Sequence, residues 1–459
     1  MLDKQNDPRN GGWPAWRLRR RPHHDRPSSR PWDAVPGPAA HAGPRRGVAR
    51  PAAFVAALVT ALAAGCSASG GAGDNPVAGC GTPGYSGNEI RLGFVYPGSG
   101  AGSTSLSAAR GGFVARIEEA NAAGGIHGRK LIYTWRDDTS TPAQNLEVVR
   151  DLVENQKVFG LVEASIAAAQ GAGYLRDHSI PATGIPAETF WADHGYRNMF
   201  AYTYLFGDGP SVSTFGDFAK AQGGTKAAVI QNDVTAAGND IGSKIGTSLT
   251  AAGIPLVPGR FTYNPNFTNP VQLGQQLKQA GADVVTAAFA GTDLAEVVRG
   301  IHEAGAPVKV ILAPSGYDKS LLKTYGQTLG GLTAAVNYIP FEIGGPAHQK
   351  YLQAISSYAP EIQPPDQELA LVTYILTDLF LYGLDKAGAC PTRAQYIDAL
   401  RASTYDAGGL LPGPVDMTKD WGQIATCYTF MRVNDAGTGY DLVPGPTGRD
   451  RWCGHRLDQ

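Results

Sequence analysis

The chain has 459 residues, which is long enough for two domains of ordinary size with substantial cores. Its 39 basic residues nearly balance its 40 acidic residues, so the net charge gives no indication of a nucleic-acid partner. The charge is unevenly distributed, because residues 1–50 are rich in arginine, proline and glycine. That composition is typical of disorder and not of a folded core.

An apolar run over residues 51–66, PAAFVAALVTALAAGC, is typical of the core of a secretory signal peptide and is too short to span a bilayer comfortably. Residues 63–66 resemble a bacterial lipobox, in which Cys66 is lipidated and becomes the mature N-terminus. A plain signal peptide and a buried helix are the alternatives. Because fifty residues precede the run, we expect the true start to lie downstream, near Val35 or Val48. Residues 1–66 are therefore predicted to be a signal peptide with an over-long leader, and the Gly/Ser-rich residues 67–88 a flexible tether.

Four further cysteines lie downstream of the signal: Cys80, Cys390, Cys427 and Cys453. In an exported protein an even number predicts disulfides, here two bonds with three possible connectivities. A metal site is less favoured, because no Cys-x-x-Cys or paired histidine spacing occurs. We expect Cys390 to pair with Cys427, and Cys80 with Cys453, so that the second bond joins the two ends of the mature chain.

From residue 89 the chain alternates short apolar runs with amphipathic segments. The apolar runs, which predict strands, are residues 90–96, 130–136, 158–162, 180–184, 227–231, 283–289 and 308–313. Between the first two, Leu106, Phe113 and Ile117 share one face of a predicted helix, which the pair Gly124 and Gly125 would close. This alternation predicts an α/β fold with parallel sheets covered on both faces.

The pattern restarts, since residues 225–254 repeat the strand, polar loop and helix of residues 90–126. Two doubly wound lobes are therefore expected, divided near residue 205. Further helices are predicted over 346–358, 367–387 and 391–402, and a late strand over 425–433, whereas the closing stretch from residue 435 carries no pattern. In such sheets ligands bind beyond the carboxyl ends of the strands, where the loops of both lobes would face each other.

The first such loop, PGSGAGS at residues 97–103, invites a dinucleotide interpretation, but Ser103 stands where the motif needs its last glycine. The acidic pair that ends the next strand, Asp137 and Asp138, also comes too late in the chain. No cofactor is therefore expected. Small hydroxyls and exposed N–H groups at a helix N-terminus suit a carboxylate or another polar group instead.

Catalytic and metal motifs are absent from the sequence, which has no G-x-S-x-G, H-E-x-x-H or phosphate-binding loop. Glu163 and Glu188 end predicted strands. They are either carboxylates of the cleft or solvated surface acids, and a surface hydrolase that uses one of them is an alternative function.

Four stretches together resemble a known family: residues 90–103, 118–145, 174–189 and 276–305. They are similar to the type I periplasmic binding proteins of the branched-chain amino acid (Leu/Ile/Val-binding) class, the substrate-binding lipoproteins of ABC transporters. The most specific piece is NAAGGIHGRK followed by DDTSTP. The resemblance implies two doubly wound parallel-sheet lobes joined by three crossover strands. Lobe 1 would comprise residues 89–205 and 338–420, lobe 2 residues 206–337 and 421–450, and residues 451–459 a tail.

The resemblance also implies a ligand site built from loops of both lobes. Lobe 1 would contribute Ser99, Gly100, Ser103, Thr104, Ser105, Glu163, Ala164, Ser165, Ile185, Pro186, Ala187, Glu188 and Tyr202. Lobe 2 would contribute Asp233, Ala237, Ala290, Thr292, Ser315 and Tyr317.

This sequence departs from the amino-acid binders where the ligand ammonium is expected, because Ser315 takes the place of the acidic residue. A buried ammonium without a carboxylate would cost several kcal/mol. Either Glu163 or Glu188 replaces the acid from lobe 1, or the ligand is uncharged, larger or more apolar. In the second case the aromatic residues either stack on the ligand or fill the lobe cores; they are Trp191, Tyr202, Tyr204, Phe289 and Tyr317.

We therefore expect a lipid-anchored, non-catalytic binder of an amino acid or related small molecule on the outer face of the membrane. Its partners would be the permease and ATPase of an ABC importer. A ligand-sensing flytrap that docks on a signalling receptor is the alternative binding role.

Overall fold

The computed structural model describes residues 80–204, 209–232, 236–289, 291–446 and 448–458, without the side chains of residues 236–238. The predicted signal peptide with Cys66, and the tether up to residue 79, lie outside the described residues. Within the described part, no helix has the length and apolar character needed to cross a membrane.

Five parallel strands form the first sheet, in the order β2-β1-β3-β4-β5. They are β1 (Glu89–Tyr96), β2 (Lys130–Asp137), β3 (Gly160–Glu163), β4 (Ala182–Gly184) and β5 (Met199–Phe200). The first four confirm the predicted strands. The two residues of β5 are too few to show a period in the sequence.

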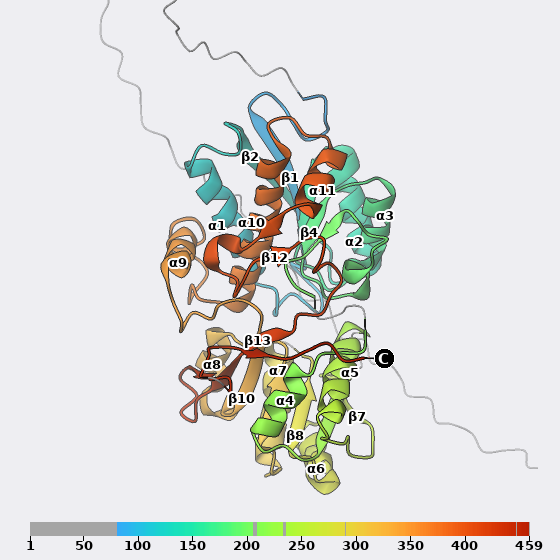
Figure 1. The fold of residues 1–459 in the computed structure, drawn as a ribbon, viewed down its shortest axis with the longest axis vertical. Coiled ribbons are helices and arrows are strands. Elements are labelled where there is room, and N and C mark those ends of the chain that lie inside the picture. The colour runs from blue at the N-terminus through green and yellow to red at the C-terminus, as the bar shows by residue number, and fades with distance from the viewer. Residues whose placement is uncertain (1–79, 205–208, 233–235, 290, 447, 459) are drawn as a thin grey trace, which may run out of the picture. The chain divides into compact units, whose positions relative to one another are not determined.

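Helices cover both faces of this sheet (Figure 1). They are α1 (Ala109–Ala122), α2 (Pro142–Arg150), α3 (Ala169–Asp177), α9 (Pro346–Tyr358), α10 (Glu368–Ala387) and α11 (Arg393–Arg401). On the α1 face, the Phe94 ring stacks on Phe113 with ring centroids 4.3 Å apart. The next residue, Val95, points to the opposite face of the sheet. There it belongs to a second apolar cluster, together with Val149 of α2 and Ala172 of α3. With both faces covered, the loops at the carboxyl edge are where this lobe can meet a ligand.

The helix predicted after the first strand is α1, and its apolar face is buried as expected. Phe113 and Ile117 are fully buried. Gly112 lets α1 approach α10 closely, since a Cβ there would lie 2.0 Å from the carbonyl oxygen of Ala370. Gly125 closes the helix by donating its N–H to the carbonyl of Ala120 at 2.8 Å, with φ +76°. Positive φ is the conformation that glycine adopts without strain.

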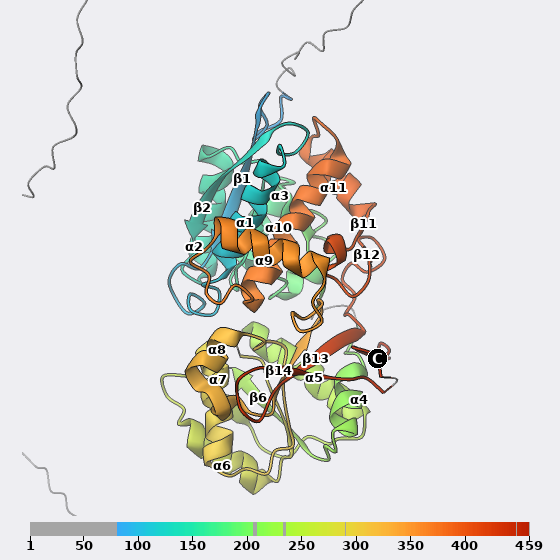
Figure 2. The same ribbon diagram turned by 90° about the vertical axis from the view of Figure 1, so that its left-hand side faces the viewer.

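The second sheet runs β14-β13-β10-β9-β8-β6-β7, with β15 paired to β13. Its strands are β6 (Ala227–Asn232), β7 (Phe261–Tyr263), β8 (Val284–Ala287), β9 (Val310–Ala313), β10 (Leu332–Val336), β13 (Cys427–Val433), β14 (Tyr440–Val443) and β15 (Trp452–Cys453). The helices α4 (Thr214–Ala221), α5 (Ala236–Ala251), α6 (Pro270–Ala280), α7 (Gly291–Glu303) and α8 (Lys319–Tyr325) flank it (Figure 2). Strands β6 to β10 are parallel, whereas β13, β14 and β15 pair antiparallel.

The chain passes between the two sheets three times: after β5, after β10 and before β13. Hydrogen bonds join the connecting segments. Asn337 donates its side-chain amide to the hydroxyl of Thr203 at 3.0 Å, and Ala425 donates its N–H to the carbonyl of Tyr204. Between the second and third passages the chain forms α9, α10 and α11, as predicted, and the short pair β11 (Thr404–Tyr405) and β12 (Val415–Asp416). The structure is thus the expected pair of α/β lobes.

The described residues contain two disulfides, but the expected pairing was wrong. Cys80 is bonded to Cys390, and Cys427 to Cys453. Cys427 and Cys453 are direct partners on β13 and β15, with Cα atoms 4.1 Å apart. Cys390 instead follows α10 in the first lobe, where the segment before β1 brings Cys80 to it.

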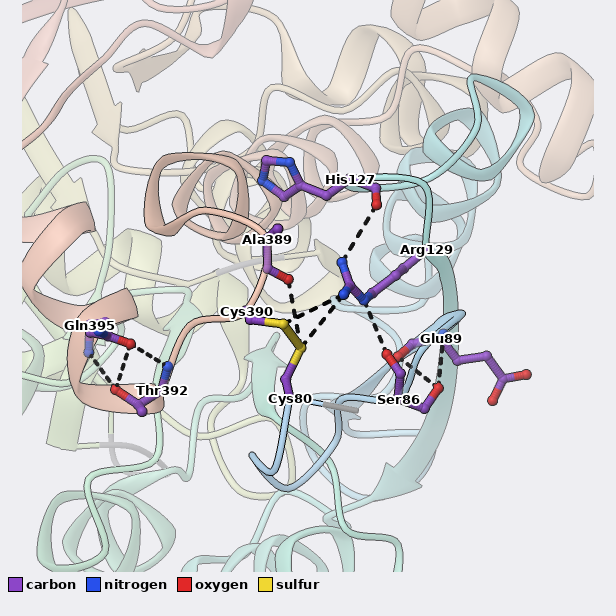
Figure 3. The surroundings of a disulfide bond; sticks show 9 residues. All are labelled: Cys80, Ser86, Glu89, His127, Arg129, Ala389, Cys390, Thr392 and Gln395. Carbon is purple, nitrogen blue, oxygen red and sulfur yellow. Dashed lines mark hydrogen bonds between the residues drawn. A yellow bond between two sulfur atoms is a disulfide. The ribbon is translucent and has the colours of Figure 1, made fainter. Parts of the chain in front are cut away.

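The Cys80–Cys390 bond lies against a buried arginine (Figure 3). The Nη2 atom of Arg129 is 3.6 Å from each sulfur, and its Nε donates to the carbonyl of Ser86 at 3.1 Å. The bond and this side chain together fix the start of the first lobe to the turn between α10 and α11.

Candidate ligand-binding site

The loop after β1, residues 97–108, is held in place by the loop after β2. Ser99 donates its hydroxyl to Asp137 at 2.8 Å, and the N–H of Gly102 donates to the Ser140 hydroxyl at 2.8 Å. Gly100 has φ +83°, and a Cβ there would lie 2.1 Å from the carbonyl oxygen of Thr139. The predicted first ligand loop is therefore a fixed arrangement in which Ser99 already has a partner of its own.

Farther along the same loop, side chains remain available. Ser103 donates its hydroxyl to the carbonyl of Gly100 at 2.8 Å, which leaves its lone pairs free to accept. Thr104 is exposed and Ser105 half-buried. These three hydroxyls are the polar surface that the loop offers.

Three carboxyl groups gather at the ends of β2, β3 and β4. Glu163 and Asp138 are fully buried, and Glu188 is half-buried. Asp138 accepts hydrogen bonds from the Ser165 hydroxyl and from the Asn145 side-chain amide. We call Asp138, Glu163 and Glu188 the acidic cluster.

Glu163 has the most unfavourable position in the acidic cluster. Neither of its carboxylate oxygens has a hydrogen-bond partner among the described residues. Burial, together with the charges of Asp138 and Glu188, raises the pKa of Glu163 to about 8. Glu163 is therefore mostly neutral at pH 7, and as it stands it lies beneath the loops and does not line a surface.

Glu188 lies on the loop after β4, and its carboxylate reaches the start of α3. Its Oε2 accepts the N–H of Ala168 at 2.6 Å. Burial raises the pKa of Glu188, against the lowering effect of the Ala168 and Ala169 N–H groups, and the charge of Asp138 adds to the rise. Among the other residues predicted on the loops after β3 and β4, Ile185 and Ala187 are half-buried, whereas Pro186, Ala164 and Ser165 are buried.

Loops of the two lobes meet at Ser105. Gly291, the first residue of α7, has φ +56°, and a Cβ there would lie 3.0 Å from the Ser105 hydroxyl oxygen. Thr292, the next residue, is exposed. On the neighbouring loop, Ser315 donates its hydroxyl to the carbonyl of Phe289 at 2.6 Å. Asp233 and Ala290 lie outside the described residues, and Ala237 belongs to α5 with its side chain outside them.

A second cluster surrounds Glu368, the first residue of α10. This buried carboxylate accepts the Tyr338 hydroxyl at 3.0 Å and the N–H of Gly316 at 3.2 Å, so it joins α10 to the loop after β9. Tyr317, buried beside it, donates its hydroxyl to Glu342. Burial is the main cause that raises the pKa of Glu368 to about 7.

The aromatic residues left open by the sequence are buried. Trp191, Tyr202, Tyr204, Phe289 and Tyr317 each expose less than a tenth of their surface. A hollow of about 240 Å³ lies instead at the connecting segments, where Tyr202, Asn337, Ala425 and Arg451 are among the lining residues. Tyr202 is the only residue of the predicted ligand site that lines this hollow. The hollow is therefore not the space between the ligand loops.

A family model described as periplasmic binding protein matches residues 89–438. The chain belongs to this family. Within the family it is a type I periplasmic binding protein of the branched-chain amino acid-binding class. A relative is the Leu/Ile/Val-binding protein homolog 3 of Brucella melitensis, 22% identical over 314 residues, which are 68% of this chain and 83% of the relative.

Two solved structures share the fold. A solute-binding protein of an ABC transporter from R. palustris, in complex with benzoate, has a TM-score of 0.64 and 16% identity over 80% of this chain and 97% of that chain. A fatty acid ABC transporter substrate-binding protein from Thermomonospora curvata has a TM-score of 0.63 and 18% identity over 79% and 93%. At such low identity the likeness shows the fold and nothing about the ligand.

For this periplasmic binding protein, sequence reasoning did not single out Glu368, nor Asn145 as a partner of Asp138. An acid at the first turn of a helix is ordinarily explained by the helix dipole, so the sequence carried no special signal for Glu368. Among the described residues there is no group of three side chains suited to hold a metal ion.

Proposed function

We propose that this periplasmic binding protein is the extracytoplasmic, substrate-binding component of an ABC importer, and that it holds an amino acid or related small molecule between the loops of its two lobes. The observation that carries the proposal is the approach of Gly291 to Ser105, which sets the carboxyl-edge loops of both sheets against each other. A solute held there touches both lobes.

The mechanism follows from that arrangement. Contacts made by both lobes at once exist only when the lobes are closed, so a ligand shifts the population toward the closed form in proportion to its differential affinity. A permease and ATPase complex would recognise that form. The solute is released unchanged, because the protein supplies contacts and no reaction step.

Export and anchoring form part of the same proposal. The signal-like run over residues 51–66 would direct the chain out of the cytoplasm, and lipidation of Cys66 would hold it at the membrane surface. Residues 67–88 would then be the tether to the first lobe.

A thermal-shift screen tests the binding function. The panel contains amino acids, amides, polyamines and aromatic acids, applied to the purified protein. A true ligand at 100 times its dissociation constant is expected to stabilise the fold by about 2.7 kcal/mol, because it binds the native state alone. A protein whose melting temperature no compound of the panel raises would contradict the proposal.

A further inference from the structure

The Cys80–Cys390 disulfide has a buried positive charge beside it (Figure 3). Arg129, the residue before β2, is 1% exposed, and its Nη2 lies 3.6 Å from each of the two sulfurs. The other guanidinium contacts go to backbone carbonyls: Nε donates to Ser86 at 3.1 Å, and Nη1 to His127 at 3.5 Å. The sulfurs therefore occupy the place where a buried guanidinium would ordinarily have an acid.

No carboxylate compensates this buried charge. Among the described residues, Arg129 forms no ion pair with an aspartate or glutamate. Two carboxylates of neighbouring segments have other partners: Glu89 pairs with Arg91 at 3.6 Å, and Asp385 with the ring of His127 at 3.9 Å. A disulfide sulfur is only a weak acceptor, so the guanidinium is left without an anion, at a cost in free energy.

A cysteine thiolate would supply the missing negative charge. The ring of Tyr85 lies 5.8 Å from the guanidinium carbon, but it offers only a neutral aromatic face. When the disulfide is reduced, a sulfur can become an anion within reach of Nη2 of Arg129. A neighbouring arginine favours the thiolate of a cysteine, and a stabilised thiolate departs faster in thiol–disulfide exchange. The surroundings of this bond therefore favour its opening.

The exposure of the two cysteines decides which sulfur is attacked. Cys390 is exposed on the turn between α10 and α11, whereas Cys80 is half-buried. A thiolate from solvent reaches Cys390, so Cys80 is the sulfur that departs beside Arg129. The Cys427–Cys453 bond also has one exposed and one half-buried cysteine, but no hydrogen bond to its sulfurs occurs in the described part of the chain. Exposure does not distinguish the two bonds, whereas the arginine does.

We propose that Cys80–Cys390 is a redox-active site that a dithiol opens by thiol–disulfide exchange, with the departing thiolate held by Arg129. A thiolate of the dithiol attacks Sγ of Cys390, the S–S bond breaks, and its electron pair goes to Cys80. The second sulfur of the dithiol then attacks the mixed disulfide and releases Cys390. The dithiol leaves as a cyclic disulfide, so two electrons pass to the protein. Of its two protons, one ends on Cys390 and the other in water.

Opening the bond releases one connection of the first lobe and leaves its neighbours in place. The bond joins the segment before β1 to the turn between α10 and α11. That segment has other attachments, because Arg91 donates its N–H to the carbonyl of Gly84 at 2.8 Å and Ser86 accepts Nε of Arg129. A dithiol would therefore loosen the beginning of the lobe and the turn after α10 without dismantling β1. The inference does not depend on the proposed ligand site.

Timed reduction of the purified protein measures the opening of each bond separately. The protein is treated with dithiothreitol at neutral pH, samples are alkylated with iodoacetamide at intervals, and peptide mass spectrometry gives the opened fraction of each bond. Cys80–Cys390 is expected to open about tenfold faster than Cys427–Cys453, or more, as a hydrogen bond to a charged group would provide. Equal rates, or faster opening of Cys427–Cys453, would overturn the proposal.

Replacement of Arg129 tests the cause of the faster opening. In Arg129→Gln the opening of Cys80–Cys390 should slow by about tenfold to hundredfold, whereas Arg129→Lys keeps the charge and should slow less. Arg91→Gln makes the same change at an exposed arginine of β1 and should leave the rate as it is. Circular dichroism shows whether each variant is folded. An unchanged rate in folded Arg129→Gln would mean that the arginine has no part in the exchange, and the proposal would be wrong.

A measurement that keeps Arg129 decides the question if Arg129→Gln does not fold. The Cys427→Ala/Cys453→Ala variant leaves Cys80–Cys390 as the bond to be reduced. After reduction, the ultraviolet absorbance of thiolate is compared between the native and the urea-unfolded protein at a mildly acidic pH, where an ordinary cysteine is a thiol. We expect a thiolate signal in the native protein that is lost in urea, because only the fold holds the guanidinium beside the sulfurs. Equal absorbance in the two states would contradict the proposal.

Discussion

Replacement of Glu163 by glutamine is expected to flatten the fall in stability that the protein undergoes between about pH 4.5 and about pH 8. The pKa of Glu163 is raised from 4.5 in the unfolded chain to about 8 in the fold, mainly by burial and then by the charges of Asp138 and Glu188. In that window the folded protein keeps a proton that the unfolded chain has lost. The contribution is complete below pH 4.5 and is lost as the pH rises through about 8.

The size of the effect follows from the same shift. At about 1.4 kcal/mol per pKa unit, it amounts to roughly 3 to 5 kcal/mol across the window. Urea unfolding at a series of pH values measures it as the difference between parent and variant. The free energy of unfolding of Glu163→Gln should rise relative to the parent as pH increases.

Glu147→Gln serves as the control, because it makes the same change on the exposed face of α2. Its profile should run parallel to that of the parent. Parallel profiles for Glu163→Gln as well would show that this carboxyl titrates normally, and the description of the acidic cluster would be wrong.

Removal of the Cys80–Cys390 bond is expected to destabilise the protein more than removal of Cys427–Cys453. The first bond joins residues 310 positions apart, the second residues 26 apart. In the chain-entropy model the longer closed loop restricts the unfolded state more, and the loss is roughly 3 to 5 kcal/mol for the Cys80→Ala/Cys390→Ala double variant. Loss of the sulfurs also removes two contacts of the buried Arg129.

Urea unfolding of the two double alanine variants without reductant measures both values. The Cys427→Ala/Cys453→Ala variant is the matched comparison, since its bond joins two strands that are already paired. Equal losses, or a larger loss for the second variant, would contradict the expected order.

The sequence predicted most of the fold because the determining signals are local. The burial of Phe113 and Ile117, and the closure of α1 by Gly125, follow from residues within one turn or two of each other. Strands such as β1 and β3 are continuous apolar runs, which indicate burial on both faces. The short strands β5 and β7 carry too few residues for any period.

What the sequence could not give depends on contacts between distant segments. The partner of Cys390 is decided by which segment the fold brings to the turn after α10, and spacing along the chain says nothing of that. In the same way, Glu368 and Gly316 are 52 positions apart and meet only because α10 and the loop after β9 come together. Tyr317 was left open between ligand stacking and core, and its hydroxyl is committed to Glu342.

Glu163 and Glu188 show most clearly the difference between what the sequence predicts and what only the structure reveals. Their positions at strand ends marked them as candidates, but sequence alone treated the two as equivalent. The structure separates them, because Glu163 is fully buried whereas Glu188 is half-buried and accepts the N–H of Ala168. Of the two residues, only Glu188 is therefore in contact with solvent.

Equilibrium dialysis of the purified protein against the compound of the thermal-shift panel that raises its melting temperature, followed by mass spectrometry of the compound released on denaturation, tests the central claim most directly. We expect one equivalent retained per chain and recovered with its mass unchanged. A compound that is converted to product by substoichiometric protein, or that is not retained at all, would contradict the account of a non-catalytic solute-binding protein.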